Sequence, residues 1–188
     1  MKTEETHSIL KHGWFHVANT YYRRYPNPHS THVLTEDVVS RKLDGHILKT
    51  VRLYKKANQA PYWLLQLLPT PAAYILEESH VDPVEKTIVT YSKNITLTTF
   101  LEVREKMVIG EHGLNRDWSA VHRSACITSS FFGLGSTFEA FGLKRYRSNI
   151  NRMDVGFDGV LSNRTSEDGD DSVDLTFSSY TPPLNYAV

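Results

Sequence analysis

Hydrophobic positions near the start of the chain have a helical period. Over residues 14–25 they recur at the three- and four-residue spacing of an amphipathic helix. Pro26 and Pro28 should end this helix, because proline lacks an amide donor and disfavours helical backbone in the residue before it. The pattern therefore places Arg23 and Arg24 in the last helical turn, where the helix dipole favours cations.

Strand-like segments follow. The β-branched-rich residues 31–44 and the return segment 46–56 flank Asp44-Gly45, a strong hairpin signal. Four later segments have a similar character: 72–81, 86–97, 98–109 and 117–131. No helix long enough for a parallel crossover separates these segments, so the pattern predicts a curved antiparallel sheet.

The return segment of the first hairpin contains cations on one face. Alternation along a strand places Arg52, Tyr54 and Lys56 on the same side. Such a face suits the wall of a cavity that contains cations, and it equally suits a solvated surface. The adjacent carboxylates Glu77 and Glu78 should point to opposite faces of their strand, which argues against an acid/base pair.

A second helical pattern spans residues 135–163 and contains no proline. Its apolar residues recur every three to five positions, and its other faces carry the basic residues Lys144, Arg145, Arg147 and Arg152. Gly142, Gly156 and Gly159 each weaken such a helix by roughly 1 kcal/mol relative to alanine, so close packing against the sheet must compensate. Helices at both ends of an antiparallel sheet predict the α+β class.

The most apolar segment, residues 61–71, is bracketed by prolines. Core packing explains it, and so does a lid or a loop that touches a membrane. Its large apolar side chains are Tyr62, Trp63, Leu64, Leu65, Leu67 and Leu68.

The formal net charge is zero but unevenly distributed. Residues 165–188 contain five acids and neither lysine nor arginine, which leaves 21 basic and 16 acidic residues, a net +5, in residues 1–164. A mildly basic body suits an anionic ligand or surface, although a solvated surface explains it equally well and the charge does not predict a nucleic-acid partner. We expect one domain over 1–164 and a disordered acidic tail over 165–188.

The sequence lacks the residues that several kinds of site require. Cys126 is the only cysteine, so an internal disulfide or a cysteine-based zinc site is excluded. His12 and His16 have metal-ligand spacing without a nearby carboxylate in sequence, so we expect no metal. Phe138 occupies the third-glycine position of a dinucleotide fingerprint, and no Walker loop, nucleophile elbow or nucleophile with a plausible base is visible. We expect neither a secretory signal nor a membrane span.

A sheet, a long helix across it, several cations and an apolar flap together suit an amphiphilic anion. Arginine forks match the geometry of phosphate, and an apolar cavity stabilises hydrocarbon by about 0.8 kcal/mol per buried methylene.

Short motifs occur in a fixed order over about residues 5–162: Arg-Tyr-Pro-Asn-Pro at 24–28, His-Val-Leu-Thr-Glu-Asp at 32–37, Arg-Leu at 52–53, Val-Asp-Pro at 81–83, and Phe-Gly-Leu at 141–143 followed by Ser148-Asn149. On these motifs the chain resembles the PRELI-like family, also called Ups or slowmo, of mitochondrial lipid-transfer proteins. These motifs are most similar to those of the PRELI branch of the family, which is associated with phosphatidic acid.

The resemblance implies a sheet of about seven antiparallel strands, wrapped by an N-terminal helix, a short lid and a long C-terminal helix. Together these elements form a lipid pocket like that of phosphatidylinositol-transfer and START folds. The resemblance also implies non-enzymatic transfer of phosphatidic acid in the mitochondrial intermembrane space. This transfer would support cardiolipin synthesis and would need no cofactor. The expected partners are anionic membranes and a small helical protein with twin Cys-x9-Cys motifs, which suits a chain with one cysteine.

By position, the resemblance implies these headgroup-binding residues: Arg24, Lys56, Arg145, Asn149 and Arg152. Arg145 and Arg152 occupy positions where relatives have lysine, and Gln59 replaces a lysine found in some of them. The lid would span about residues 62–73. Two alternatives stay open: transfer of phosphatidylserine by the same fold, and a regulatory interaction module with a vestigial pocket.

Overall fold

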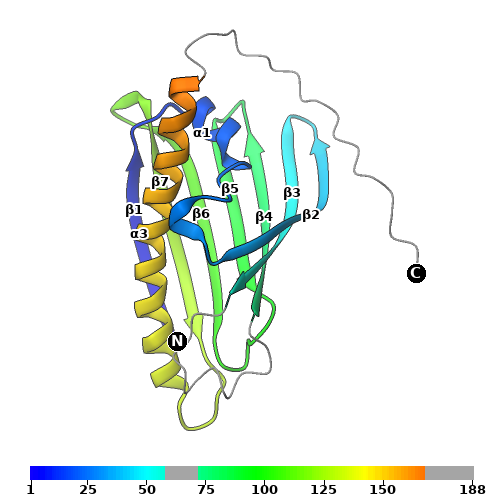
Figure 1. Ribbon diagram of the computed structural model, residues 1–188, viewed down its shortest axis with the longest axis vertical. Helices are drawn as coiled ribbons and strands as arrows, with labels where there is room; N and C mark the ends of the chain where they lie inside the picture. Colours follow the sequence, from blue (N-terminus) through cyan, green and yellow to red (C-terminus); the bar gives the residue numbers. More distant parts are fainter. Residues whose placement is uncertain (58–71, 168–188) are drawn as a thin grey trace, which may run out of the picture.

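The computed structural model describes residues 1–57 and 72–167 as a seven-stranded antiparallel sheet packed against helices (Figure 1). The strands are β1 (Lys2–Leu10), β2 (Val33–Asp44), β3 (Ile47–Ala57), β4 (Ala72–Asp82), β5 (Thr87–Asn94), β6 (Glu102–His112) and β7 (Asn115–Thr128). Their spatial order is β1-β7-β6-β5-β4-β3-β2, so β2 to β7 form a meander and β1 lies beside the last strand. The α+β fold with a seven-stranded sheet is confirmed.

The hydrophobic pattern did not predict strand β1. Before the buried Leu10 at its end, the less exposed positions are Glu4, Thr6 and Ser8, which are polar, so most of the strand lacks the alternation of apolar and polar residues typical of a half-buried strand. The strand is specified by pairing with β7, in which His7 faces His122 and the two imidazole rings stack with centroids 4.4 Å apart. Such non-local pairing leaves no local signal in the sequence.

Helix α1 (Trp14–Tyr21) ends four residues earlier than predicted. Tyr22 is its C-cap, and the chain then passes through Asn27 into the short 3₁₀ helix η1 (Pro28–Ser30). Arg23 and Arg24 therefore follow the helix instead of occupying its last turn, and that prediction was wrong. Leaving the helical path directs Arg24 into the protein interior, where it is buried, whereas Arg23 is exposed.

Helix α3 (Gly135–Glu167) runs along the β1 and β7 side of the sheet (Figure 1). It continues three residues past the expected domain boundary at 164, and residues 168–188 of the expected tail lie outside the described part of the chain. A Cβ atom on Gly142 would lie 2.7 Å from Leu101, and one on Gly156 would lie 2.6 Å from Asn27. These approaches are closer than side chains tolerate, so Gly142 and Gly156 permit the close packing expected from the sequence. A Cβ atom on Gly159 would meet nothing within 4 Å, so the expectation was wrong at that position.

The hydrophobic core fills the end of the sheet that α1 covers. Trp14, Val17 and Tyr21 from α1 pack there with Phe157 and Leu161 from α3. The other half of the space between sheet and α3 is lined by different residues, and it contains the main cavity. Among the described residues, no helix is both long and apolar enough to cross a bilayer.

Candidate anion-binding site

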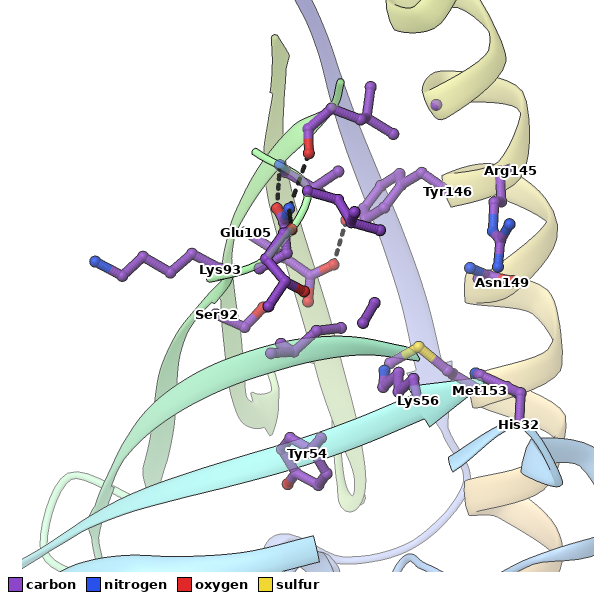
Figure 2. Close-up of a pocket in the computed structure, with 18 of the residues that line it drawn as sticks. His32, Tyr54, Lys56, Ser92, Lys93, Glu105, Arg145, Tyr146, Asn149 and Met153 are labelled. Atoms are coloured by element: carbon purple, nitrogen blue, oxygen red, sulfur yellow. Dashed lines mark hydrogen bonds between the residues drawn. The ribbon is translucent and has the colours of Figure 1, made fainter. Parts of the chain in front are cut away.

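A cavity of about 250 Å³ lies between the sheet and α3 (Figure 2). Part of its wall is apolar and comes from the β5–β6 loop, β6 and α3: Leu97, Phe100, Leu101, Val103, Phe138, Phe141 and Ile150. Another part is cationic, with Lys56 from β3 and Arg145 from α3. One cavity thus combines the surroundings that a hydrocarbon chain and an anion each require.

The cationic wall is a cluster that draws on both the sheet and the helix. Figure 2 shows Arg145 and Asn149 on α3, at the same side of the cavity as His32 and Lys56. Arg152, one helical turn beyond Asn149, donates a hydrogen bond of 2.6 Å to the Asn149 side-chain oxygen. We call His32, Lys56, Arg145, Asn149 and Arg152 the cation cluster.

The charges of the cation cluster are not balanced by the described side chains, residues 1–57 and 72–164. Within them, no carboxylate forms an ion pair with Lys56, Arg145 or Arg152. Burial and the neighbouring charge of Arg152 lower the pKa of Arg145 below its ordinary value. The buried Nε atom of Arg152 has no hydrogen-bond partner in this part of the chain. Like charges held together without a counter-ion favour the binding of an anion.

The positive charges of the cation cluster also change the pKa of His32. It is buried, and burial together with the charges of Lys56, Arg152 and Arg145 lowers its pKa to about 4. The imidazole is therefore neutral at physiological pH, and an anion in the cluster would favour its protonated form.

A second group of arginines has a carboxylate at its centre, and part of this group also lines the cavity. Glu77 on β4 accepts hydrogen bonds from Arg24 at 2.7 Å and from Arg52 at 2.6 Å. The hydroxyls of Tyr21 and Tyr54 donate to the same carboxylate at 3.1 and 3.2 Å. We call these five residues the Glu77 network.

The Glu77 network is electrically balanced once Glu36 is included, because Arg52 also forms an ion pair with Glu36. Burial by itself would raise the pKa of Glu77, but Arg24 and Arg52 outweigh it and lower that pKa, so the carboxylate is ionised. Burial alone would likewise lower the pKa of Arg24, and the Glu77 charge raises it instead. Two arginines and two carboxylates leave no net charge in this group.

The structure brings the sequence-predicted headgroup residues to one cavity. Arg24, Lys56, Arg145 and Asn149 line it directly, and Arg152 lies behind Asn149. Arg24 differs from the others because its two terminal nitrogens already donate to Tyr21 O, Tyr54 Oη and Glu77. The roles of these residues as lipid ligands stay predictions.

Two parts of the site were missed in the sequence. His32 was considered only as part of a family motif. Its position, at the start of the hairpin that carries Arg52 and Lys56, could have suggested that it lies near these cations. The Glu77 network had a partial signal, since alternation placed Arg52, Tyr54 and Lys56 on one face. That face does contribute Tyr54 and Lys56 to the cavity wall.

The expected lid cannot be compared with the structure. Gln59 and the side chains Tyr62, Trp63, Leu64, Leu65, Leu67 and Leu68 lie outside the described residues. Ala72 and Ala73, at the end of the expected lid, belong to β4.

The histidine pair has a carboxylate neighbour that sequence spacing could not show. Asp158 from α3 lies 3.4 Å from His12, whose ring centroid is 5.5 Å from that of His16. The expectation that no carboxylate is close to this pair was therefore wrong. Over residues 1–57 and 72–164, no three potential ligands gather closely enough to hold a metal ion.

Proteins of known sequence and structure resemble this chain. "PRELI domain-containing protein 1, mitochondrial" is 38% identical in Gallus gallus and 37% identical in Homo sapiens, over 85% of this chain and 76% and 75% of those proteins. "Protein UPS1, mitochondrial" from Saccharomyces cerevisiae is 29% identical over 77% of this chain and 84% of its own length. The names of these relatives support the mitochondrial location expected from the sequence.

Solved structures show the fold alone, because their sequence identity is low. TTHA0849 from Thermus thermophilus superposes with a TM-score of 0.61 at 11% identity, over 87% of this chain and 99% of that one. The Zhui aromatase/cyclase from Streptomyces gives 0.56 at 7% identity, over 87% and 95%. Residues 16–167 match the model of the PRELI-like family, and the chain therefore belongs to that family.

Proposed function

We propose that this protein is a non-enzymatic carrier that transfers phosphatidic acid between mitochondrial membranes across the intermembrane space, in support of cardiolipin synthesis. The observation that carries this proposal is the cation cluster: Lys56, Arg145 and Arg152 adjoin an apolar-walled cavity without a carboxylate partner among the described side chains. Membership of the PRELI-like family and the mitochondrial names of the relatives support it.

A phosphate monoester suits this cluster better than a phosphodiester. A monoester carries about −1.5 to −2 charges near neutral pH and three oxygens that accept hydrogen bonds. Three cations and the amide of Asn149 can satisfy these oxygens, and guanidinium groups bind them in a bidentate manner. The phosphodiester of phosphatidylserine has one negative charge and a bulkier substituent, so we expect it to compete poorly.

The apolar wall serves the acyl chains. Phe100, Phe138 and Phe141 face the same cavity as the cation cluster, and each methylene transferred from water gains about 0.8 kcal/mol. Transfer requires extraction and release of the lipid and no bond cleavage, so the lipid is cargo and no cofactor is needed. The small helical twin Cys-x9-Cys partner implied by the family belongs to this proposal as well.

Arg145 is the position that tests the proposal, and α3 offers a matched control. Arg147 lies on the same helix but pairs with Glu4 at the surface. Arg145→Ala should lose most vesicle-to-vesicle transfer of phosphatidic acid, whereas Arg147→Ala should transfer at the wild-type rate. Equal rates for the two variants would contradict the proposal. Adding phosphatidylserine as a competitor to the same assay measures the headgroup preference.

Arg24 is a poor position for this test, because its substitution disturbs folding. A glutamate at position 24 would lie beside buried Glu77, and two unpaired buried carboxylates are strongly unfavourable. Loss of transfer in Arg24→Glu would then report unfolding. Circular dichroism and mass spectrometry of co-purified lipid should accompany every variant, so that fold, cargo and transfer are measured separately.

A further inference from the structure

Two neighbouring loops at one end of the sheet contain no charged residue. The β5–β6 loop spans residues 95–101, and the β7–α3 loop with the first turn of α3 spans residues 129–138. The loops contact each other, since the Ser130 amide donates to the Thr99 carbonyl at 3.2 Å. We call the two segments the apolar tip, and Figure 1 shows them together at the lower end of the molecule.

The apolar tip is continuous with the apolar wall of the cavity. Phe131 stacks on Phe100 with ring centroids 5.1 Å apart and contacts Phe138 edge-on at 5.2 Å. Phe100 and Phe138 in turn line the cavity. A path of aromatic side chains therefore leads from the inside of the cavity to the surface of the tip.

The surface of the apolar tip exposes large hydrophobic side chains. Phe132 is 99% exposed, and Leu134 and Ile95 are about half exposed. A side chain as exposed as Phe132 contributes no packing to the described fold, and clustered exposed apolar residues mark surfaces that bind another apolar phase. At the opposite end of β6 and β7, Leu114 is 96% exposed, in a turn flanked in sequence by charged Glu111 and Arg116.

We propose that the apolar tip inserts into the surface of a phospholipid bilayer and aligns the apolar wall of the cavity with the acyl region. This inference rests on the proposed carrier function. A bilayer is favoured over a protein partner because the aromatic path ends at the tip. A lipid surface would give acyl chains an apolar route from the bilayer to the cavity, whereas a protein covering the tip would block it.

Phe132→Asp tests the inference, with Leu114→Asp as the matched control. Both positions are almost fully exposed, so neither substitution should affect folding. In flotation with vesicles of phosphatidylcholine and phosphatidic acid, we expect Phe132→Asp to bind about tenfold more weakly than wild type, equivalent to about 1.4 kcal/mol. Leu114→Asp should float like wild type. Equal binding of the three proteins, or equal losses in both variants, would overturn the proposal.

Tryptophan substitutions at the same two positions measure insertion directly. With vesicles that contain brominated phosphatidylcholine, the fluorescence of Phe132→Trp should be quenched more than that of wild type, which has three tryptophans. Leu114→Trp should show no additional quenching. Quenching at position 114 but not at position 132 would show that the opposite end of the sheet meets the membrane.

A cargo measurement separates this inference from the proposed function. When phosphatidic acid is supplied from detergent micelles, Phe132→Asp should retain it in native mass spectrometry, whereas Arg145→Ala should lose it and still float. If wild-type protein holds no phosphatidic acid, the proposed function fails and flotation alone decides the role of the tip. If Phe132→Asp weakens only the binding of a protein partner, the membrane inference is wrong.

Discussion

Arginine occupies opposite surroundings in two neighbouring groups beside one cavity. In the Glu77 network, Arg24 and Arg52 share a buried carboxylate, and Arg52 also pairs with Glu36. In the cation cluster, the charges of Lys56, Arg145 and Arg152 all act on His32, and none of the three has a carboxylate partner in residues 1–57 and 72–164. The number of cations is similar, but only the second group leaves charge for a ligand.

Under the proposed function, this difference separates a structural role for the Glu77 network from a binding role for the cation cluster. A buried ion pair costs much desolvation energy, and removing one partner leaves the other charge uncompensated. A cluster of like charges is instead held together by the fold at a cost in stability that a bound anion would relieve. Substitutions in the Glu77 network should therefore change stability, and substitutions in the cation cluster should change affinity.

The largest effect should come from Glu77→Ala. It leaves Arg24 and Arg52 buried without their shared carboxylate, so we expect a loss of about 3–5 kcal/mol in the free energy of unfolding. Glu78→Ala is the control, because Glu78 is exposed on the other face of β4 and pairs with His80 instead of an arginine of the network. Urea unfolding followed by circular dichroism measures both, and similar stabilities would show that the network contributes little.

Low pH should reduce the stability that the Glu77 network contributes to the folded protein. The pKa of Glu77 is lower in the folded protein than its ordinary value of 4.5, so the unfolded chain binds its proton first as the pH falls. The corresponding stability is present above pH 4.5 and is lost progressively below it, by on the order of 3 kcal/mol. Unfolding curves of wild type and Glu77→Gln across this range check the effect, since the variant should lose less stability in acid.

Arg145→Ala should weaken ligand binding and leave the stability of the fold nearly unchanged. Removing a cation that faces Arg152 should leave the free energy of unfolding within about 0.5 kcal/mol of wild type, or slightly raise it. The loss of charge-assisted hydrogen bonds should weaken binding of a soluble short-chain phosphatidic acid by about 1.5–3 kcal/mol. Calorimetry measures the binding, and a variant that is unstable yet binds normally would reverse the assignment of the two groups.

The smallest expected effect is at His32. Its pKa of about 4 in the free protein should rise when a phosphate monoester enters the cation cluster, because the added negative charge favours the imidazolium. A rise of one pH unit corresponds to about 1.4 kcal/mol. Proton NMR titration of the ring, assigned with His32→Gln, measures the shift, and an unchanged pKa would place the phosphate elsewhere.

The sequence predicted those features that have local signals. The hairpin turn at Asp44-Gly45 and the long α3 helix depend on residues close together in the chain, and both are present. The opposite orientations of Glu77 and Glu78 also follow from strand geometry, and the structure confirms them, since Glu77 is buried and Glu78 is exposed.

Features that depend on distant partners were not predictable. Strand β1 has polar residues at the less exposed positions that precede Leu10, and it is specified by β7, more than a hundred residues away in the chain. Arg24 was interpreted from its helix and its motif, but its principal partner, Glu77, is 53 residues further along. That no carboxylate within residues 1–57 and 72–164 pairs with Arg145 is likewise visible only when the surrounding elements are in place.

The close contacts of α3 have a consequence for the geometry of binding. Arg145 and Arg152 are on this helix, whereas Lys56 is on the sheet, so the distance between these cations depends on how closely the helix packs against the sheet. Gly142 and Gly156 permit this close packing, because a methyl group at either position would lie less than 3 Å from the side chain of Leu101 or Asn27, and either that side chain or the helix would have to move. The distance between the cations of the helix and the cation of the sheet thus depends on two residues that have no side chain.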